Sequence, residues 1–303
     1  RAILSFMTQS SGLTLGCGMD HVIETDCAFT TDACCEDDFA AVVFKVRGEA
    51  GKPVRLVKFL SYHYGAQTTP QEIRSQTAWT LDRALEDGFD RVLERQQAHV
   101  RTFWEHADIE VEGGQAPEKQ QVIRWNLFQL LQASARAEGN GIGARGLTGQ
   151  TYEGHYFWDT EIYVLPFLVY TNPRMARSIL KHRYDQLTKA RARARELGHP
   201  GASFPWRTIN GDEASAYYAA GTAQYHINAD IMYALRKYVD ATGDSDFLHR
   251  YGAEMLVETA RFWLDLGGFT GEGGRRFVIN GVTGPDEYTA VVNNNYFTNL
   301  MAR

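Results

Sequence analysis

The feature that most constrains the fold is an alternation of helical segments with long, aromatic, glycine-rich loops, which fills the chain after residue 113. Apolar residues recur at helical spacing in the segments 118–137, 161–170, 172–197, 226–242 and 245–266. Between successive helix pairs lie the glycine-rich loops 138–160, 199–225 and 267–293. This pattern predicts an α-helical toroid whose loops converge on one face.

The first part of the chain has a different pattern. Short runs rich in valine, isoleucine, phenylalanine and tyrosine predict strands at 2–6, 22–25, 39–46 and 54–62. Their spacing is typical of a sandwich. Thr69 and Pro70 then provide a helix start, and the charged segment 70–106 predicts long, partly exposed helices that link two units. A further short strand is expected at Asp108–Glu112.

Composition excludes several classes of protein. A net charge of −6 argues against a nucleic-acid binder, and no apolar run approaches the roughly 20 residues of a membrane-spanning helix. The cysteines match no zinc spacing, so we expect free thiols, no bound metal and a cytoplasmic location. They are Cys17, Cys27, Cys34 and Cys35. Because the chain begins at Arg1 and stops inside an expected helix, we expect a fragment of a longer protein.

Three loops hold the residues that could carry chemistry. The first, Gly146–Glu161, and the second, Gly201–Asp230, combine aromatic residues with carboxylates and histidines. In the third, a rigid Gly-Pro turn is followed by Asp286 and Glu287. Aromatic rings stack on the apolar faces of sugars, and polar side chains bind the hydroxyls. A carboxylic acid can protonate the leaving oxygen of a glycosidic bond, so these loops favour a sugar site.

Plainer interpretations of the same loops stay open at this point. The acidic pair at 286–287 could be a solvated turn, and the pair at 212–213 an ordinary one. The aromatic residues could plug a barrel mouth or form a subunit contact. His155 and His226 could be partly buried histidines with satisfied nitrogens.

Five motifs occur in order along the chain: GLTGQTYEGHYFWDTEIYVLPF (146–167), GASFPW (201–206), QYHINADI (224–231), ETARFW (258–263) and VTGPDEY (282–288). Together they resemble glycoside hydrolase family 65, the inverting α-glucoside phosphorylases for maltose, trehalose and kojibiose with the related acid trehalases. The resemblance implies a mainly α fold, an (α/α)6 barrel preceded by a β-sandwich and a helical linker. We therefore expect the end of the sandwich at 1–66, the linker at 67–112 and the first part of the barrel at 113–303.

The resemblance also implies roles for single residues. The glutamate of the GPDEY motif is the family's general acid, which falls on Glu287. The FWD tripeptide contacts the non-reducing glucose, which falls on Trp158 and Asp159.

The loop after the GASFPW motif is expected to shape the acceptor site, here around Arg207 and Glu213. His155 and His226 complete the expected substrate-binding set. In one departure from the pattern, Thr289 stands where many family members have histidine. The family's phosphate-binding serine and histidine are expected beyond the end of this chain.

The expected reaction is inverting phosphorolysis of an α-glucosidic disaccharide of the trehalose, maltose or kojibiose type. It yields β-glucose 1-phosphate and a free sugar, with Glu287 as general acid, inorganic phosphate as nucleophile and co-substrate, and no cofactor. One alternative is an inverting hydrolase of the trehalase type, whose base would lie outside this chain. The other is a non-catalytic carbohydrate-binding fragment. The expected partners are the disaccharide, phosphate and a second subunit in a homodimer.

Overall fold

A computed structural model describes residues 1–66, 68–134, 139–147, 149, 151–216 and 218–303. The chain divides into two compact units, Arg1–Thr102 and Phe103–Arg303.

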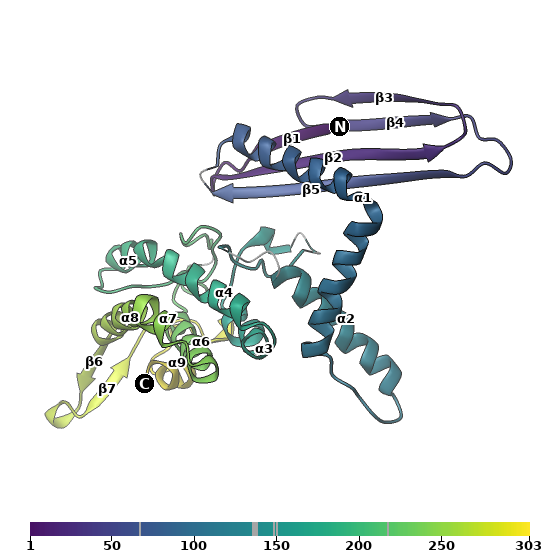
Figure 1. Ribbon diagram of the computed structural model, residues 1–303. Helices are drawn as coiled ribbons and strands as arrows, with labels where there is room; N and C mark the ends of the chain where they lie inside the picture. The colour runs from purple at the N-terminus through teal and green to yellow at the C-terminus, as the bar shows by residue number, and fades with distance from the viewer. Residues whose placement is uncertain (67, 135–138, 148, 150, 217) are drawn as a thin grey trace. The chain divides into compact units, whose positions relative to one another are not determined.

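The first unit is built on antiparallel strands (Figure 1). One sheet has the order β1-β2-β5, and a two-stranded sheet pairs β3 with β4. Their bounds are β1 Ala2–Met7, β2 Leu13–Thr25, β3 Phe29–Cys35, β4 Ala40–Val46 and β5 Val54–Ala66. The four predicted strands are confirmed, although β2 begins well before residue 22. Strand β3 was missed because its residues, all of them exposed, show no apolar alternation.

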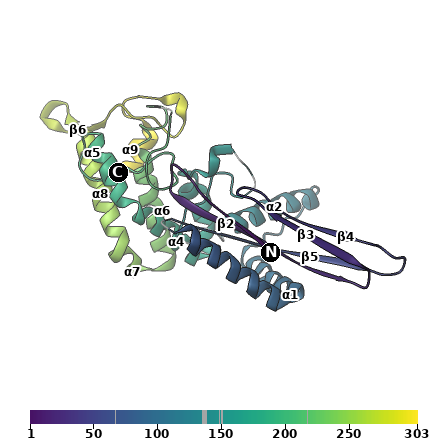
Figure 2. The ribbon, with the colours of Figure 1, turned by 90° about the horizontal axis from the view of Figure 1, so that it is seen from above.

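Helix α1 (Pro70–Ala107) runs along the three-stranded sheet with its first turns (Figures 1 and 2). Its start is the predicted one: Glu72 N donates to Thr69 Oγ1 at 3.2 Å, and Thr69 N donates back to the Glu72 carboxylate at 2.9 Å. Close approach depends on glycine in β2, because a Cβ at Gly18 would lie 2.5 Å from the methyl group of Thr77. Gly88, at a φ of 75°, breaks the helix in its middle.

The second unit is mainly helical. Its helices are α2 (Ala116–Ser134), α3 (Leu165–Thr171), α4 (Pro173–Asp185), α5 (Leu187–Glu196), α6 (His226–Thr242), α7 (Ser245–Phe247), α8 (Ala253–Leu266) and α9 (Tyr296–Ala302). Two π-helical turns, Thr160–Val164 and Leu248–Gly252, precede α3 and α8. Strands β6 (Gly267–Thr270) and β7 (Arg276–Ile279) form a hairpin within the third loop.

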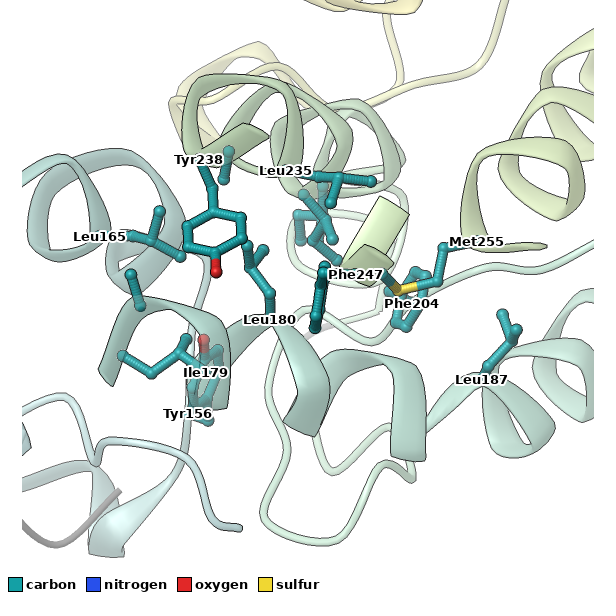
Figure 3. Packing of buried hydrophobic residues seen from close by; sticks show 14 of the residues in the cluster. Tyr156, Leu165, Ile179, Leu180, Leu187, Phe204, Leu235, Tyr238, Phe247 and Met255 are labelled. Atoms are coloured by element: carbon teal, nitrogen blue, oxygen red, sulfur yellow. The ribbon is translucent and has the colours of Figure 1, made fainter. Parts of the chain in front are cut away.

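Helix α6 contributes buried residues to the core of this unit, among them Leu235 and Tyr238 (Figure 3). It has the predicted bounds, and its apolar stripe includes Leu235 and Tyr238, which are almost fully buried. This stripe packs with Leu165 of α3, Leu180 of α4 and other apolar residues from the loops. Such close packing gives the loops between the helices a fixed base.

Three local predictions were wrong or incomplete. The segment 172–197 is two helices, because the chain turns at Gln186 between α4 and α5. The segment 245–266 is interrupted by the π turn before α8. Asp108–Glu112 forms no strand, since its backbone bonds to a side chain: Gln120 accepts from Val111 N at 2.9 Å and donates to Ile109 O at 2.6 Å. The predicted helix end at residues 135–137 lies outside the described residues.

In the part of the chain that the structure describes, no helix combines the length and the apolar character needed to cross a membrane.

Candidate active site

The loop that carries Glu287 is fixed at both ends. Val282 and Val292 exchange backbone hydrogen bonds of 3.0 and 2.8 Å, which close the loop. Gly284 is required inside it, because a Cβ there would lie 2.6 Å from both Asn295 Nδ2 and Thr289 Oγ1. The loop is thus held in one path, and it presents Glu287 in a short 3-10 turn.

The two neighbouring carboxylates of this loop have different roles. Asp286 caps the turn, because its Oδ1 accepts a 3.0 Å hydrogen bond from Tyr288 N. Glu287 is exposed, and its Oε1 accepts a 3.2 Å hydrogen bond from Gln224 Nε2. Asp286 therefore orders the loop, and Glu287 is the carboxylate that is available for chemistry.

Asp159 lies close enough to Glu287 for the two charges to interact, and Trp158 is the residue before it. Burial removes water from the Asp159 carboxyl group and raises its pKa, and the negative charges of Glu161 and Glu287 raise this pKa further. The Trp158 ring packs edge-to-face on His226, with ring centroids 5.0 Å apart, and also contacts Phe297. The structure thus brings together an indole ring and two carboxyl groups from two separate loops.

A buried ion pair anchors the loop that carries Trp158 and Asp159. Arg183 of α4 donates from Nε and Nη2 to Glu161 at 2.7 and 3.1 Å, and Tyr156 donates to Glu161 Oε1 at 2.6 Å. The side chains of Glu161 and Arg183 are fully buried. The sequence gives no signal for this pairing beyond the presence of both residues, since 22 positions separate them.

Arg207, His155 and Glu213 form a second group. Arg207 Nη2 lies 3.1 Å from Glu153 Oε2 and 3.2 Å from His155 Nδ1. Backbone hydrogen bonds between Tyr156 and Thr208, of 2.7 and 3.2 Å, join the first and second loops here. Side chains from two loops are therefore available to contact a bound molecule.

Glu213 is directed toward its own loop. Its carboxylate accepts hydrogen bonds from the backbone nitrogens of Trp206, Arg207 and Ser215 at 2.7, 3.2 and 3.1 Å. It therefore holds the shape of the loop and leaves little capacity to bind a sugar hydroxyl.

His226 lies behind the surface of the site. Its side chain is fully buried, with Nδ1 2.7 Å from Asp230 Oδ2 and Nε2 3.2 Å from Gln224 Oε1. Both nitrogens have protein partners, so His226 supports the neighbouring side chains and has no free polar atom for a ligand. Sequence reasoning missed Gln224 and Asp230, although both fall within the QYHINADI motif.

A hollow of about 840 Å³ elsewhere in this unit lies along α2 and is lined by residues such as Gln120, Trp125 and Phe128. It contains none of the predicted site residues. Among the described residues, no group of three or more histidine, cysteine and acidic side chains could hold a metal ion.

Comparisons with known proteins agree with the motifs. The Glycosyl hydrolase family 65 central catalytic domain matches residues 124–303, and the family's N-terminal domain matches residues 1–103. An α,α-trehalose phosphorylase of Thermoanaerobacter brockii is 47% identical over 98% of this chain and 38% of its own length. A kojibiose phosphorylase of Escherichia coli is 35% identical over 84% of this chain and 35% of its own length.

A solved structure agrees as well. A candidate kojibiose phosphorylase from the human microbiome superposes with a TM-score of 0.86 at 30% identity, over 99% of this chain and 39% of that one. The chain thus spans well under half the length of these relatives. With two family domains matched in order and relatives similar over nearly its whole length, this chain belongs to glycoside hydrolase family 65.

Proposed function

We propose that the protein to which this chain belongs is an inverting disaccharide phosphorylase that acts on an α-glucoside. The observation that carries the proposal is the placement of Glu287, which a rigid loop presents close to Asp159, the residue after Trp158. The names of the relatives support the same reaction class. Of the trehalose, maltose and kojibiose types of substrate, we favour trehalose, because the 47% identical relative is named for it.

In this reaction, protonated Glu287 gives its proton to the glycosidic oxygen as the bond to the anomeric carbon breaks. Inorganic phosphate attacks that carbon from the opposite face, so β-glucose 1-phosphate and a free sugar form. Phosphate is already an anion, and no second protein carboxylate is needed to activate it. Trp158 supplies an apolar ring for the glucose, and Asp159 accepts hydrogen bonds from its hydroxyls.

We assign Arg207 and His155 to the acceptor side of the site, because they lie on the loops next to the glucose side. Glu213 and His226 act indirectly, by holding these loops and Trp158 in place.

We also propose the expected domain plan. Residues 1–66 end a β-sandwich, 67–112 are a helical linker, and 113–303 supply the first helices of an (α/α)6 barrel. The repeated helix-and-loop pattern of α3 to α9 supports the last assignment. A homodimer, a cytoplasmic location and the lack of a cofactor stay predictions.

Phosphate dependence of the full-length protein tests the reaction. Trehalose, maltose and kojibiose would each be supplied with and without phosphate, and β-glucose 1-phosphate and free glucose would be measured separately. We expect phosphorolysis of one of them and negligible hydrolysis. Equal cleavage without phosphate would instead favour an inverting hydrolase, which needs a second carboxylate at roughly 6.5–9.5 Å to activate water.

Glu287→Gln tests the general acid. We expect phosphorolysis to fall by about 10²–10⁴-fold, the usual contribution of acid catalysis, while sugar binding is kept. Asp286→Asn is the matched control, because it changes the neighbouring carboxylate but keeps the oxygen that caps the turn. Full activity of Glu287→Gln would show that another group is the acid. A full-length protein that binds sugars but turns over none of them would favour the non-catalytic alternative.

A further inference from the structure

A row of buried polar side chains, linked by hydrogen bonds, ends at Glu287. Asp230, His226 and Gln224 are almost fully buried, and each is hydrogen-bonded to the next. The last of them, Gln224, reaches Glu287 through its Nε2. Buried polar groups are costly unless they are paired, so each atom in this row must act as the donor or acceptor that its neighbour requires.

The orientation of the Gln224 amide follows from its surroundings. Its Nε2 lies 3.0 Å from the backbone oxygen of Ala220 and 3.2 Å from Glu287 Oε1. A carbonyl oxygen can only accept, so the NH₂ group must be on this side. The amide oxygen therefore faces His226 Nε2, at 3.2 Å, and this nitrogen must carry a proton.

The proton on Nε2 restricts the other end of the imidazole. His226 Nδ1 and Asp230 Oδ2 are 2.7 Å apart and must share one proton. Burial raises the pKa of Asp230. Its Oδ1 has no hydrogen-bond partner among the described residues, which leaves a carboxylate charge poorly compensated. Whichever of the two residues carries the shared proton, the order of donors toward the acid is the same: His226 donates from Nε2 to Gln224, and Gln224 donates to Glu287.

We infer that Gln224 is a positioning residue for the general acid: it holds Glu287 Oε1, so that the proton leaves from Oε2. This inference rests on the proposed function. Because Oε1 accepts the amide N–H whether or not Glu287 is protonated, the contact fixes the carboxyl group before and after proton transfer. His226 and Asp230 act one step further back, by keeping the amide in the orientation that offers N–H to Glu287.

The same histidine also supports the ring proposed to bind glucose. Trp158 and His226 form an edge-to-face ring contact, and Phe297 contacts both rings. A change at His226 would therefore disturb both the Trp158 ring and the hydrogen bonds that reach Glu287. The hydrogen bonds of the Gln224 side chain go to Ala220, His226 and Glu287, so a change at Gln224 perturbs the acid more selectively.

The test uses the full-length enzyme and two substrates that differ in their need for an acid. Trehalose needs protonation of its leaving oxygen, whereas α-glucosyl fluoride releases fluoride with little help. Gln224→Met keeps the length of the side chain but removes the donor. We expect kcat with trehalose to fall by about 10- to 100-fold, the scale of a misplaced catalytic group, while KM changes by less than about 3-fold. Phosphorolysis of the fluoride should change by less than about 3-fold.

Glu287→Gln serves as the reference for loss of the acid. If it is inactive on trehalose and Gln224→Met has normal kcat, the inference is wrong and the proposed function stands. If Gln224→Met loses both substrates equally, its role is only structural, which also overturns the inference. If Glu287→Gln keeps full activity, the proposed function itself fails. Should Gln224→Met not fold, Gln224→Asn, which keeps the amide but withdraws it from Glu287, must show the same selective loss.

Discussion

Removing one partner of the buried ion pair between Glu161 and Arg183 is expected to destabilise the second unit strongly. Both side chains have 0% exposure, and three hydrogen bonds satisfy the carboxylate. In Arg183→Met, Glu161 keeps only the hydroxyl of Tyr156 and stays buried without a compensating charge. Breaking a buried pair in this way costs roughly 3–5 kcal/mol. For a domain of this size, each kcal/mol lowers Tm by about 2–4 °C, so Tm should fall by roughly 6–20 °C.

The matched control is Arg236→Met on α6. Arg236 also pairs with a carboxylate, Asp240, at 3.4 Å, but both side chains are largely exposed. Such pairs contribute only about 0–1 kcal/mol because water and salt screen them. Thermal unfolding of the full-length variants at one scan rate would compare the two. A fall in Tm for Arg183→Met no larger than that of Arg236→Met would refute the reasoning.

A double variant makes the test sharper. If burial of an unpaired charge is the cause, Glu161→Gln combined with Arg183→Met should cost clearly less than the sum of the two single changes. Strict additivity would contradict this explanation. Because Glu161 follows the loop that carries Trp158 and Asp159, KM for the disaccharide should also rise in Arg183→Met.

Two further predictions concern pH and packing. Burial, with the nearby charge of Arg183, lowers the pKa of His182 from 6.5 to about 4. The fold therefore has the full benefit of a neutral ring above pH 6.5, and this contribution of about 3 kcal/mol is lost as the pH falls toward 4. His182→Gln should flatten the dependence of Tm on pH in that window, and an unchanged slope would contradict this explanation. In the first unit, Gly18→Ala should lower the free energy of unfolding by about 1–3 kcal/mol in a urea titration, because its Cβ would meet Thr77 and Leu81. Gly48→Ala is the control, since a Cβ there meets nothing within 4 Å, and equal effects of the two changes would count against the packing argument.

Local sequence signals were sufficient for features that depend on neighbouring residues. The helix start at Thr69 and Pro70, the bounds of α6 and the fixed Gly-Pro loop before Glu287 were all predictable. In each case the deciding interactions span a few residues, so they can be recognised without knowing the rest of the fold.

Two features in which a glutamine side chain bonds to a nearby group were not predictable in the same way. The turn at Gln186 was missed because helical periodicity continues across it, and there Gln186 Nε2 bonds to His182 Nε2 at 2.9 Å. The segment 108–112 has the composition of a strand, but the side chain of Gln120 bonds to its backbone groups, and within the described residues no strand pairs with it.

By itself, the sequence determined the family, the helix-and-loop plan and Glu287 as the candidate acid, because ordered motifs and local periodicity are read along the chain. Only the tertiary structure decided which role each acidic residue has. Asp286 accepts a hydrogen bond from the backbone of its own turn, Glu161 pairs with Arg183, and Glu287 accepts a hydrogen bond from Gln224. A carboxylate has the same chemistry at every position, and its role depends on which donors the fold brings within hydrogen-bonding distance.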